Sequence, residues 1–158
     1  MPGTGRIPVR IPPGVDTGAQ IRVPGEGHAG PDPAGRGDLV VVTRVRPHAF
    51  FTRKGDHLCC EVPVTVPEAA LGARIQLPTP EGPVVVTVPA GTQSGQVLRI
   101  RGRGCPRRDR GGRGDLLVAT RVVIPRNADS TLAGVLRELQ RLWPENPRAA
   151  MWSGRGPT

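Results

Sequence analysis

Hydrophobic residues alternate with polar ones along most of this 158-residue chain, and a spacing of three and four appears only near its end. The alternating runs lie at 21–23, 39–45, 58–66, 75–77, 84–88, 98–100 and 116–122, and turns rich in Gly and Pro separate them. Alternation of this kind predicts strands that bury one face. Short strands closed by frequent turns predict an all-β fold of the sandwich type.

Two stretches interrupt the predicted strands. "PEAALG" at 67–72 starts with proline and ends with glycine, which predicts a short helical turn. Near the end, Asp129 or Ser130 can cap a helix that Pro144 stops. Its apolar stripe consists of Leu132, Val135, Leu136, Leu139, Leu142 and Trp143. A lone helix of about fourteen residues is marginal in water, so we expect this stripe to be buried on the chain's own sandwich or on a second chain.

The chain repeats itself at an offset of 77 residues. The stretch 11–45 aligns with 88–122 without a gap, and 16 of the 35 aligned positions are identical. Each copy has a proline-glycine turn, a short strand, a glycine-rich loop and a longer strand. A repeat of this kind predicts two similar β subdomains in series.

The repeat contains an Arg-Gly-Asp tripeptide in each copy, at 36–38 and 113–115. This tripeptide is the signal that integrins bind on matrix proteins. Here it sits twice at the same point, where a glycine loop enters a strand. Glycine gives the loop backbone freedom and Asp is a common turn residue, so we predict a structural role and no adhesion.

The two copies are not equally complete. In the register of the repeat, first-copy equivalents of the strands at 57–66 and 73–77 would fall before Met1. We therefore expect an incomplete first β subdomain at 1–51, a second subdomain at 52–127, a helix at 128–143 and a disordered tail at 144–158.

Composition argues against several classes of function. The formal charge is +9, mostly from arginine, but the chain has only two Phe, two Trp and no Tyr with which to stack bases. Three cysteines form no CxxC pair, and no His, Ser and carboxylate fall into a catalytic arrangement, so we expect no metal, no cofactor and no enzyme. The start of the sequence, "MPGTGRIPVRIPPG", has no apolar h-region, and no run is long enough to span a membrane, so we expect a cytoplasmic protein.

The repeat, the helix and the segment "RPHAFFTRKGDHLCCEVPVTVPEAALG" together resemble the C-terminal client-binding region of DnaJ-type J-protein co-chaperones, from about Gly5 to Trp143. That family has two β-sandwich subdomains in series and a C-terminal dimerisation helix. The family's His-Pro-Asp tripeptide and its CxxCxGxG zinc module are not found in this sequence.

The resemblance implies roles for individual residues. It places Ile7, Val9 and Ile11 on a first strand and, with Phe51, in a groove for apolar segments of unfolded client proteins. It implies a homodimer through Leu132, Leu136, Leu139 and Trp143, and a DnaK-type chaperone tail as a further partner. From the residues alone, Ile7, Val9 and Ile11 fit a core equally well, and His48 fits a role in ordering the loop before Phe51.

Two alternatives remain open from the sequence. One is an Arg-rich nucleic-acid-binding β protein, because residues 101–115 are densely basic. The other is a remnant of a co-chaperone that has lost its function.

Overall fold

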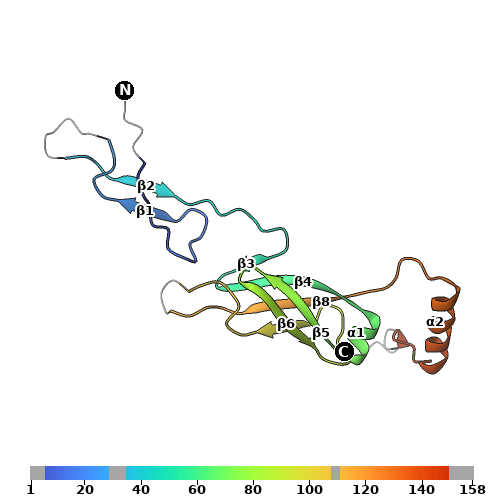
Figure 1. The fold of residues 1–158 in the computed structure, drawn as a ribbon. Helices are drawn as coiled ribbons and strands as arrows, with labels where there is room; N and C mark the ends of the chain where they lie inside the picture. Colours follow the sequence, from blue (N-terminus) through green and yellow to red (C-terminus); the bar gives the residue numbers. More distant parts are fainter. Residues whose placement is uncertain (1–5, 29–34, 108–110, 150–158) are drawn as a thin grey trace. The chain divides into compact units, whose positions relative to one another are not determined.

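The computed structural model describes residues 6–28, 35–107 and 111–149 (Figure 1). The chain divides into two compact units, Met1–Val123 and Ile124–Thr158. Within the described residues, the first unit holds the strands and a short helix, and the second holds a longer helix. No described helix is both long enough and apolar enough to cross a membrane.

A four-stranded sheet and a hairpin form the larger part of the first unit. The strands of the sheet, in the spatial order β3-β4-β8-β7, are β3 Thr52–Lys54, β4 His57–Thr65, β8 Leu116–Val123 and β7 Val97–Ile100. β4 and β8 run parallel, whereas the other two pairs are antiparallel. The hairpin consists of β5 Ala73–Thr79 and β6 Gly82–Val88. Together they form the β-rich fold that the alternating pattern predicts.

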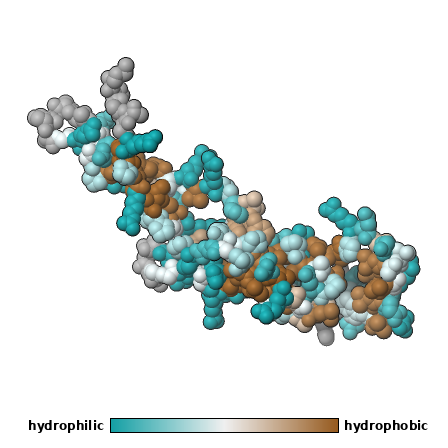
Figure 2. Space-filling model, in the orientation of Figure 1, coloured by the Kyte–Doolittle hydropathy of each residue, from teal (hydrophilic) through white to brown (hydrophobic). Residues whose placement is uncertain are grey.

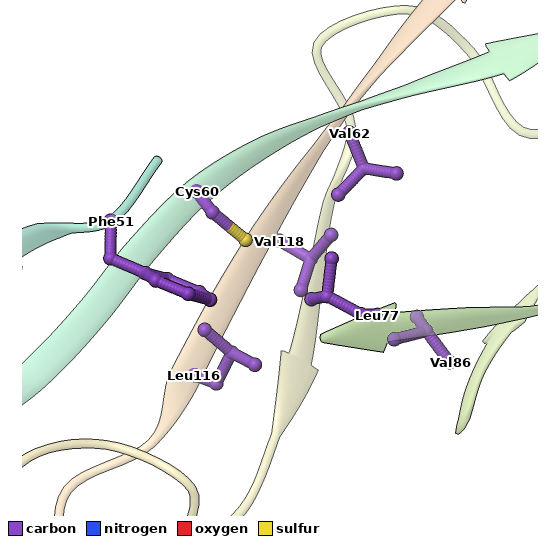
Figure 3. Packing of buried hydrophobic residues seen from close by; sticks show 7 residues of the cluster. All are labelled: Phe51, Cys60, Val62, Leu77, Val86, Leu116 and Val118. Carbon is purple, nitrogen blue, oxygen red and sulfur yellow. The ribbon is translucent and has the colours of Figure 1, made fainter. Parts of the chain in front are cut away.

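The hydrophobic core collects the apolar faces of the sheet and of the hairpin (Figure 3). Cys60 and Val62 of β4 are buried, whereas Glu61 between them is exposed. The cluster is completed by Phe51, Leu77, Val86, Leu116 and Val118. Each buried side chain of this size contributes about 1.5 to 3 kcal/mol. This cluster therefore makes the second subdomain, which begins at about residue 52, the stable part of the unit.

The short helix α1, Val66–Leu71, follows β4 directly. Thr65 accepts a hydrogen bond from the Glu68 backbone N–H, and the Glu68 carboxylate accepts one from the Thr65 N–H at 2.8 Å. This reciprocal cap fixes the start of the helix and lowers the pKa of Glu68, chiefly through the Thr65 backbone N–H. Gly72, with φ 83°, ends it. The helical turn predicted from "PEAALG" is thus confirmed.

The first copy of the repeat forms an antiparallel ribbon of β1, Gln20–Val23, and β2, Leu39–Val42. It matches the β7–β8 pair strand for strand. Gln20 lies opposite Val42 in the first copy, as Val97 lies opposite Ala119 in the second. The sequence repeat is therefore a repeat of structure with the same register.

The turns that close the two ribbons also match. The Thr43 N–H donates to the Ala19 carbonyl at 3.0 Å, and the Thr120 N–H donates to the Gln96 carbonyl at 2.9 Å. Both threonine hydroxyls donate to carbonyls of the preceding turn as well. Thr43, just after β2, and Thr120, within β8, therefore fasten each strand to the turn before its partner strand.

The two copies differ in burial. Leu116 and Val118 are 0% exposed, but their equivalents Leu39 and Val41 are only half-buried. Among the described residues before Phe51, none is buried. Hydrophobic side chains consequently reach the surface over the β1–β2 ribbon (Figure 2). The β1–β2 ribbon therefore has the same strand pairing as β7 and β8, but its apolar side chains are not buried in a core.

Three details differ from the expectation drawn from the sequence. The predicted first strand with Ile7, Val9 and Ile11 is wrong, because residues 6–12 form no strand. β3 was missed, since "TRK" has no apolar alternation. The parallel pairing of β4 with β8 was also missed, because alternation reveals strands but not the direction in which they pair.

The second unit contains helix α2, Ser130–Leu142. Asp129 caps it, and its carboxylate accepts from the Leu132 N–H at 2.7 Å, so one of the two predicted caps is confirmed. Trp143 ends the helix just before Pro144. Of the tail expected at 144–158 to be disordered, residues 150–158 lie outside the described part of the chain.

Candidate functional site

A cavity of about 700 Å³ lies in the first unit, where the turn before β1 meets the second copy of the repeat. Several segments that are distant in sequence line it: the turn at 14–17, the connection at 45–48, the start of β3 and the loop at 105–106. Its apolar lining residues are Val15, Val45, Pro47, Phe51, Leu58, Pro80 and Pro106. The volume lies in the range of small-ligand pockets, and the lining suits an apolar side chain.

Arg53 of β3 holds the turn that forms one wall of this cavity. Its guanidinium donates to the carbonyls of Val15 at 3.1 Å and Gly14 at 3.0 Å, and it pairs with the Asp16 carboxylate at 3.2 Å. The Arg53 side chain is only 25% exposed. A half-buried guanidinium with several acceptors is a strong clamp, so Arg53 fixes the turn to the sheet.

Glycine is required at position 14 by this close approach. Gly14 has φ 81°, and a Cβ added there would lie 2.5 Å from the Pro106 carbonyl oxygen. Any side chain would push the turn away from the loop at 105–106. The close approach of Gly14 to Pro106 therefore brings two of the lining segments together.

His48 orders the segment that leads into Phe51. Its Nδ1 accepts hydrogen bonds from the backbone N–H groups of Phe50, at 3.1 Å, and Phe51, at 3.2 Å. The His48 and Phe51 rings also lie 5.3 Å apart, centroid to centroid. The prediction that His48 orders this loop is confirmed.

Phe51 lines the cavity and also belongs to the core. It is 7% exposed and packs with Cys60 and Leu116 (Figure 3). Its neighbour Phe50 is 38% exposed. The resemblance places Phe51 in a groove, and the structure buries this ring while its neighbour Phe50 reaches the surface. The pairing of β3 with β4 explains why Phe51 is buried. Because Thr52 lies opposite Cys59, Phe51 falls opposite Cys60, on the core face.

The other predicted client-binding residues do not line the cavity. Ile7 and Val9 are half-buried, and Ile11 is 56% exposed. They lie in the segment just before Gly14. The structure therefore brings Phe51, but not Ile7, Val9 or Ile11, to this site.

Both Arg-Gly-Asp turns hold their loop in the same way. Asp38 accepts from the Gly25 N–H at 3.0 Å and pairs with Arg22. The second-copy equivalent, Asp115, accepts from the Gly102 N–H at 2.8 Å and pairs with Arg99.

The same contacts lower the pKa of both carboxyls, first through the glycine N–H and then through the arginine. The hydrogen bonds explain the structural role predicted for the tripeptides. In each copy the aspartate carboxylate accepts from a glycine N–H at the opposite end of the loop.

The three cysteines are not arranged as reactive or metal-binding thiols in the part of the chain that the structure describes. Cys59, Cys60 and Cys105 are free, and burial raises the pKa of Cys60 to about 11, so its thiol stays protonated at neutral pH. Burial also raises the pKa of Cys105. Within the ranges that the structure describes, no three His, Cys, Asp or Glu side chains gather as a metal site would need.

The second unit carries a separate apolar surface. Leu136 and Leu139 are 43% exposed and Trp143 is 59% exposed, while Leu132 is half-buried. None of the helix residues is buried. The stripe predicted from the spacing is present on α2 and available for contact.

Comparison with known proteins agrees with this arrangement. The family model described as the DnaJ C terminal domain matches residues 2–125. Chaperone protein DnaJ 2 of Mycolicibacterium paratuberculosis is 49% identical over 154 residues, which are 96% of this chain and 39% of that protein. The chaperone protein DnaJ of Bacillus cytotoxicus is 48% identical over 84% of this chain and 36% of its own length.

A third relative, the chaperone protein DnaJ of Roseiflexus castenholzii, is 46% identical over 91% of this chain and 39% of that protein. The chain thus spans well under half the length of these relatives. The repeated ribbons, the β sheet with its hairpin and the matched sequence together show that the chain belongs to the DnaJ C-terminal domain family.

Proposed function

We propose that this chain binds apolar segments of non-native polypeptides and acts as the client-binding part of a co-chaperone that assists protein folding. The observation that carries the proposal is the apolar cavity of about 700 Å³ beside Phe51, in a chain of the DnaJ C-terminal domain family. Such a role needs neither a cofactor nor a catalytic group. It depends only on the burial of apolar client surface, at about 25 cal/mol for each Å².

The construction of the cavity supports this use. Arg53 and Asp16 neutralise each other at its wall, so an apolar side chain entering there leaves no buried charge unpaired. Val45 is 51% exposed and can meet a client without rearrangement of the core. Ile7, Val9 and Ile11 precede the Gly14 turn and extend the proposed contact along the client.

The partners of the whole protein belong to the same proposal. Leu132, Leu136, Leu139 and Trp143 would pair α2 with the α2 of a second copy, because an exposed apolar stripe of this width is stabilised by burial. A homodimer would offer a client two cavities. The tail of a DnaK-type chaperone is the further partner that the family suggests.

The test is suppression of aggregation of a chemically unfolded protein, measured by light scattering without nucleotide. Val45→Asp places a charge in the cavity and should raise the chain concentration needed for half-maximal suppression several-fold. Val85→Asp is the matched control, because Val85 is 48% exposed on β6 and lies outside the cavity lining. Equal suppression by both variants would refute the cavity as the client site.

Salt separates this function from nucleic-acid binding. Phosphate contacts weaken steeply between about 50 and about 200 mM salt, whereas apolar burial does not. Suppression should therefore persist across this range.

A further inference from the structure

The loop between β7 and β8 carries positive charge that its counterpart in the first copy lacks. At the offset of the repeat, Arg101 stands where the first copy has Pro24, and Arg103 stands where it has Glu26. Both loops nevertheless close in the same way, through an aspartate that accepts from a glycine N–H and pairs with an arginine of the preceding strand. The loop therefore forms without these two arginines, and the fold does not account for their charge.

Two other turns lie against this loop at the same end of the second subdomain. The Cys105 N–H donates to the carbonyl of Asp56, in the turn between β3 and β4, at 2.9 Å. Arg113 pairs with Glu81, in the turn between β5 and β6. Lys54 is the last residue of β3, which ends beside the start of β4, and β4 begins together with its parallel partner β8. Charged residues of three turns are thus brought to one end of the subdomain.

Part of this charge is neutralised locally. Three ion pairs form at this end, namely Arg99 with Asp115, Arg107 with Asp56 and Arg113 with Glu81. Among the described residues, no carboxylate pairs with Lys54, Arg101 or Arg103, and all three are exposed. We call these three residues the basic end. The ion pairs hold the loop to its neighbours, so the basic end is presented on a fixed frame.

The exposure of these cations decides which anion they can bind. An exposed pair between a guanidinium and a carboxylate contributes at most about a fivefold gain in affinity, so a short acidic peptide gains little here. A nucleic-acid duplex carries one charge for about every 1.7 Å of its axis and releases condensed counterions when it is bound. Each phosphate contact then gains about fifteenfold in affinity when salt falls from about 1 M to about 50 mM. The guanidinium fork also matches the geometry of phosphate oxygens.

The sequence of these turns selects a duplex over a single strand. Proteins bind single strands largely by stacking the bases on aromatic side chains. Neither Phe nor Trp occurs at 54–56, 79–82 or 101–115. A duplex keeps its bases stacked inside and presents phosphates outward, and phosphate contacts carry no sequence information directly.

We propose that the basic end, formed by Lys54, Arg101 and Arg103, binds the phosphate backbone of a nucleic-acid duplex without reading its base sequence. This activity goes beyond the proposed function, since none of the three residues lines the cavity. The anion is defined by its phosphates, which either an RNA or a DNA duplex supplies.

The test is fluorescence anisotropy of a labelled RNA duplex and of a DNA duplex, each of mixed sequence and about 20 base pairs long, titrated with the full chain. We expect a dissociation constant of about 1 to 100 µM, the usual range for binding without sequence preference. Three phosphate contacts predict a slope of log affinity against log salt of about −2.7 between about 50 and about 200 mM. The duplex that binds more tightly identifies the source of the phosphates.

A pair of double variants separates the basic end from net charge. Arg101→Gln combined with Arg103→Gln should weaken binding at least tenfold at about 50 mM salt and reduce the slope by about 2. The control is Arg74→Gln combined with Arg137→Gln, which removes the same charge from exposed positions on β5 and α2. This control should leave the slope nearly unchanged.

The first copy supplies a third variant. Arg103→Glu introduces the residue that position 26 has in a loop of the same construction, so the loop should still close. Its melting temperature should stay near that of the wild type, while duplex binding falls further than in Arg103→Gln, because a negative charge then faces the phosphates.

The duplex site and the client cavity can fail separately. The double variant at Arg101 and Arg103 should suppress aggregation as well as the wild type does. The cavity variant Val45→Asp should bind the duplex normally.

Three results would overturn the proposal. The first is equal weakening by the two double variants, which would assign binding to net charge alone. The second is affinity that does not change with salt. The third is displacement of the duplex by a polyglutamate peptide at the same concentration of charge, which would make the basic end a site for acidic polypeptides.

Discussion

Phe50 and Phe51 are chain neighbours whose rings meet edge to face, with centroids 5.0 Å apart. Their exposures differ because β3 turns Phe51 toward Cys60 and leaves Phe50 outside. Phe51 therefore serves both the core and the cavity. A change at this residue would alter stability together with the proposed client contact, so Val45 is the better probe of the proposed function.

This division predicts unequal losses of stability. Phe51→Ala should lower the free energy of unfolding by about 3 to 5 kcal/mol, the usual result of emptying an aromatic core site. Phe50→Ala should lower it by less than about 1 kcal/mol, as for most surface changes. Urea denaturation followed by circular dichroism measures both. Similar midpoints for the two variants would contradict the burial of Phe51.

At the scale of elements, the same loop is built twice with different burial. The Asp38 side chain is 26% exposed, whereas that of Asp115 is 9% exposed at the end of the loop between β7 and β8. Asp115 also donates its backbone N–H to His57 Nδ1 at 3.1 Å, which ties the loop to β4. The second loop is thus part of the cooperative core, and the first fastens only its own ribbon.

The lowered pKa of Asp115 sets the direction of a pH dependence. Its folded value lies below the ordinary 3.8, so the stabilisation is complete above that value and is lost as the pH falls through the folded pKa. Asp115→Asn should lower the melting temperature at pH 7 and flatten its decline as the pH falls below about 4. Asp38→Asn should change the melting curve less. An unchanged acid slope in Asp115→Asn would contradict this account.

The sequence predicted the elements better than their assembly. Alternation located the long strands, the spacing of Leu132 to Trp143 located α2, and the repeat located two equivalent ribbons. The sequence did not predict β3, because its three polar residues show no alternation of apolar and polar positions. The cavity escaped as well, since it depends on the clamp between Arg53 and the Gly14 turn, two groups that are distant in sequence.

At the scale of the whole molecule, α2 belongs to a compact unit separate from the one that holds the strands. Our proposal that the apolar stripe of α2 serves association rests on the helix having no buried residue. We expect the chain to sediment as a dimer at tens of micromolar. Leu139→Glu should shift it toward the monomer by placing a charge in the contact. Gln140→Glu adds the same charge beside the stripe and should leave the dimer intact.

A monomeric wild-type chain, or equal weakening by both substitutions, would count against pairing through α2.

The parallel pairing of β4 with β8 also determines how late in synthesis the sheet can be completed. Leu58 and its partner Leu116 are separated by most of the second subdomain. At a synthesis rate of about 5 to 20 residues per second, β4 waits roughly 3 to 12 s for the strand that completes its sheet. During that interval β4 can pair with β3, but its other edge and its apolar face stay uncovered, and such a segment is the kind that holding chaperones capture. Slower translation between β6 and β8 should therefore increase the dependence of this protein's own folding on other chaperones.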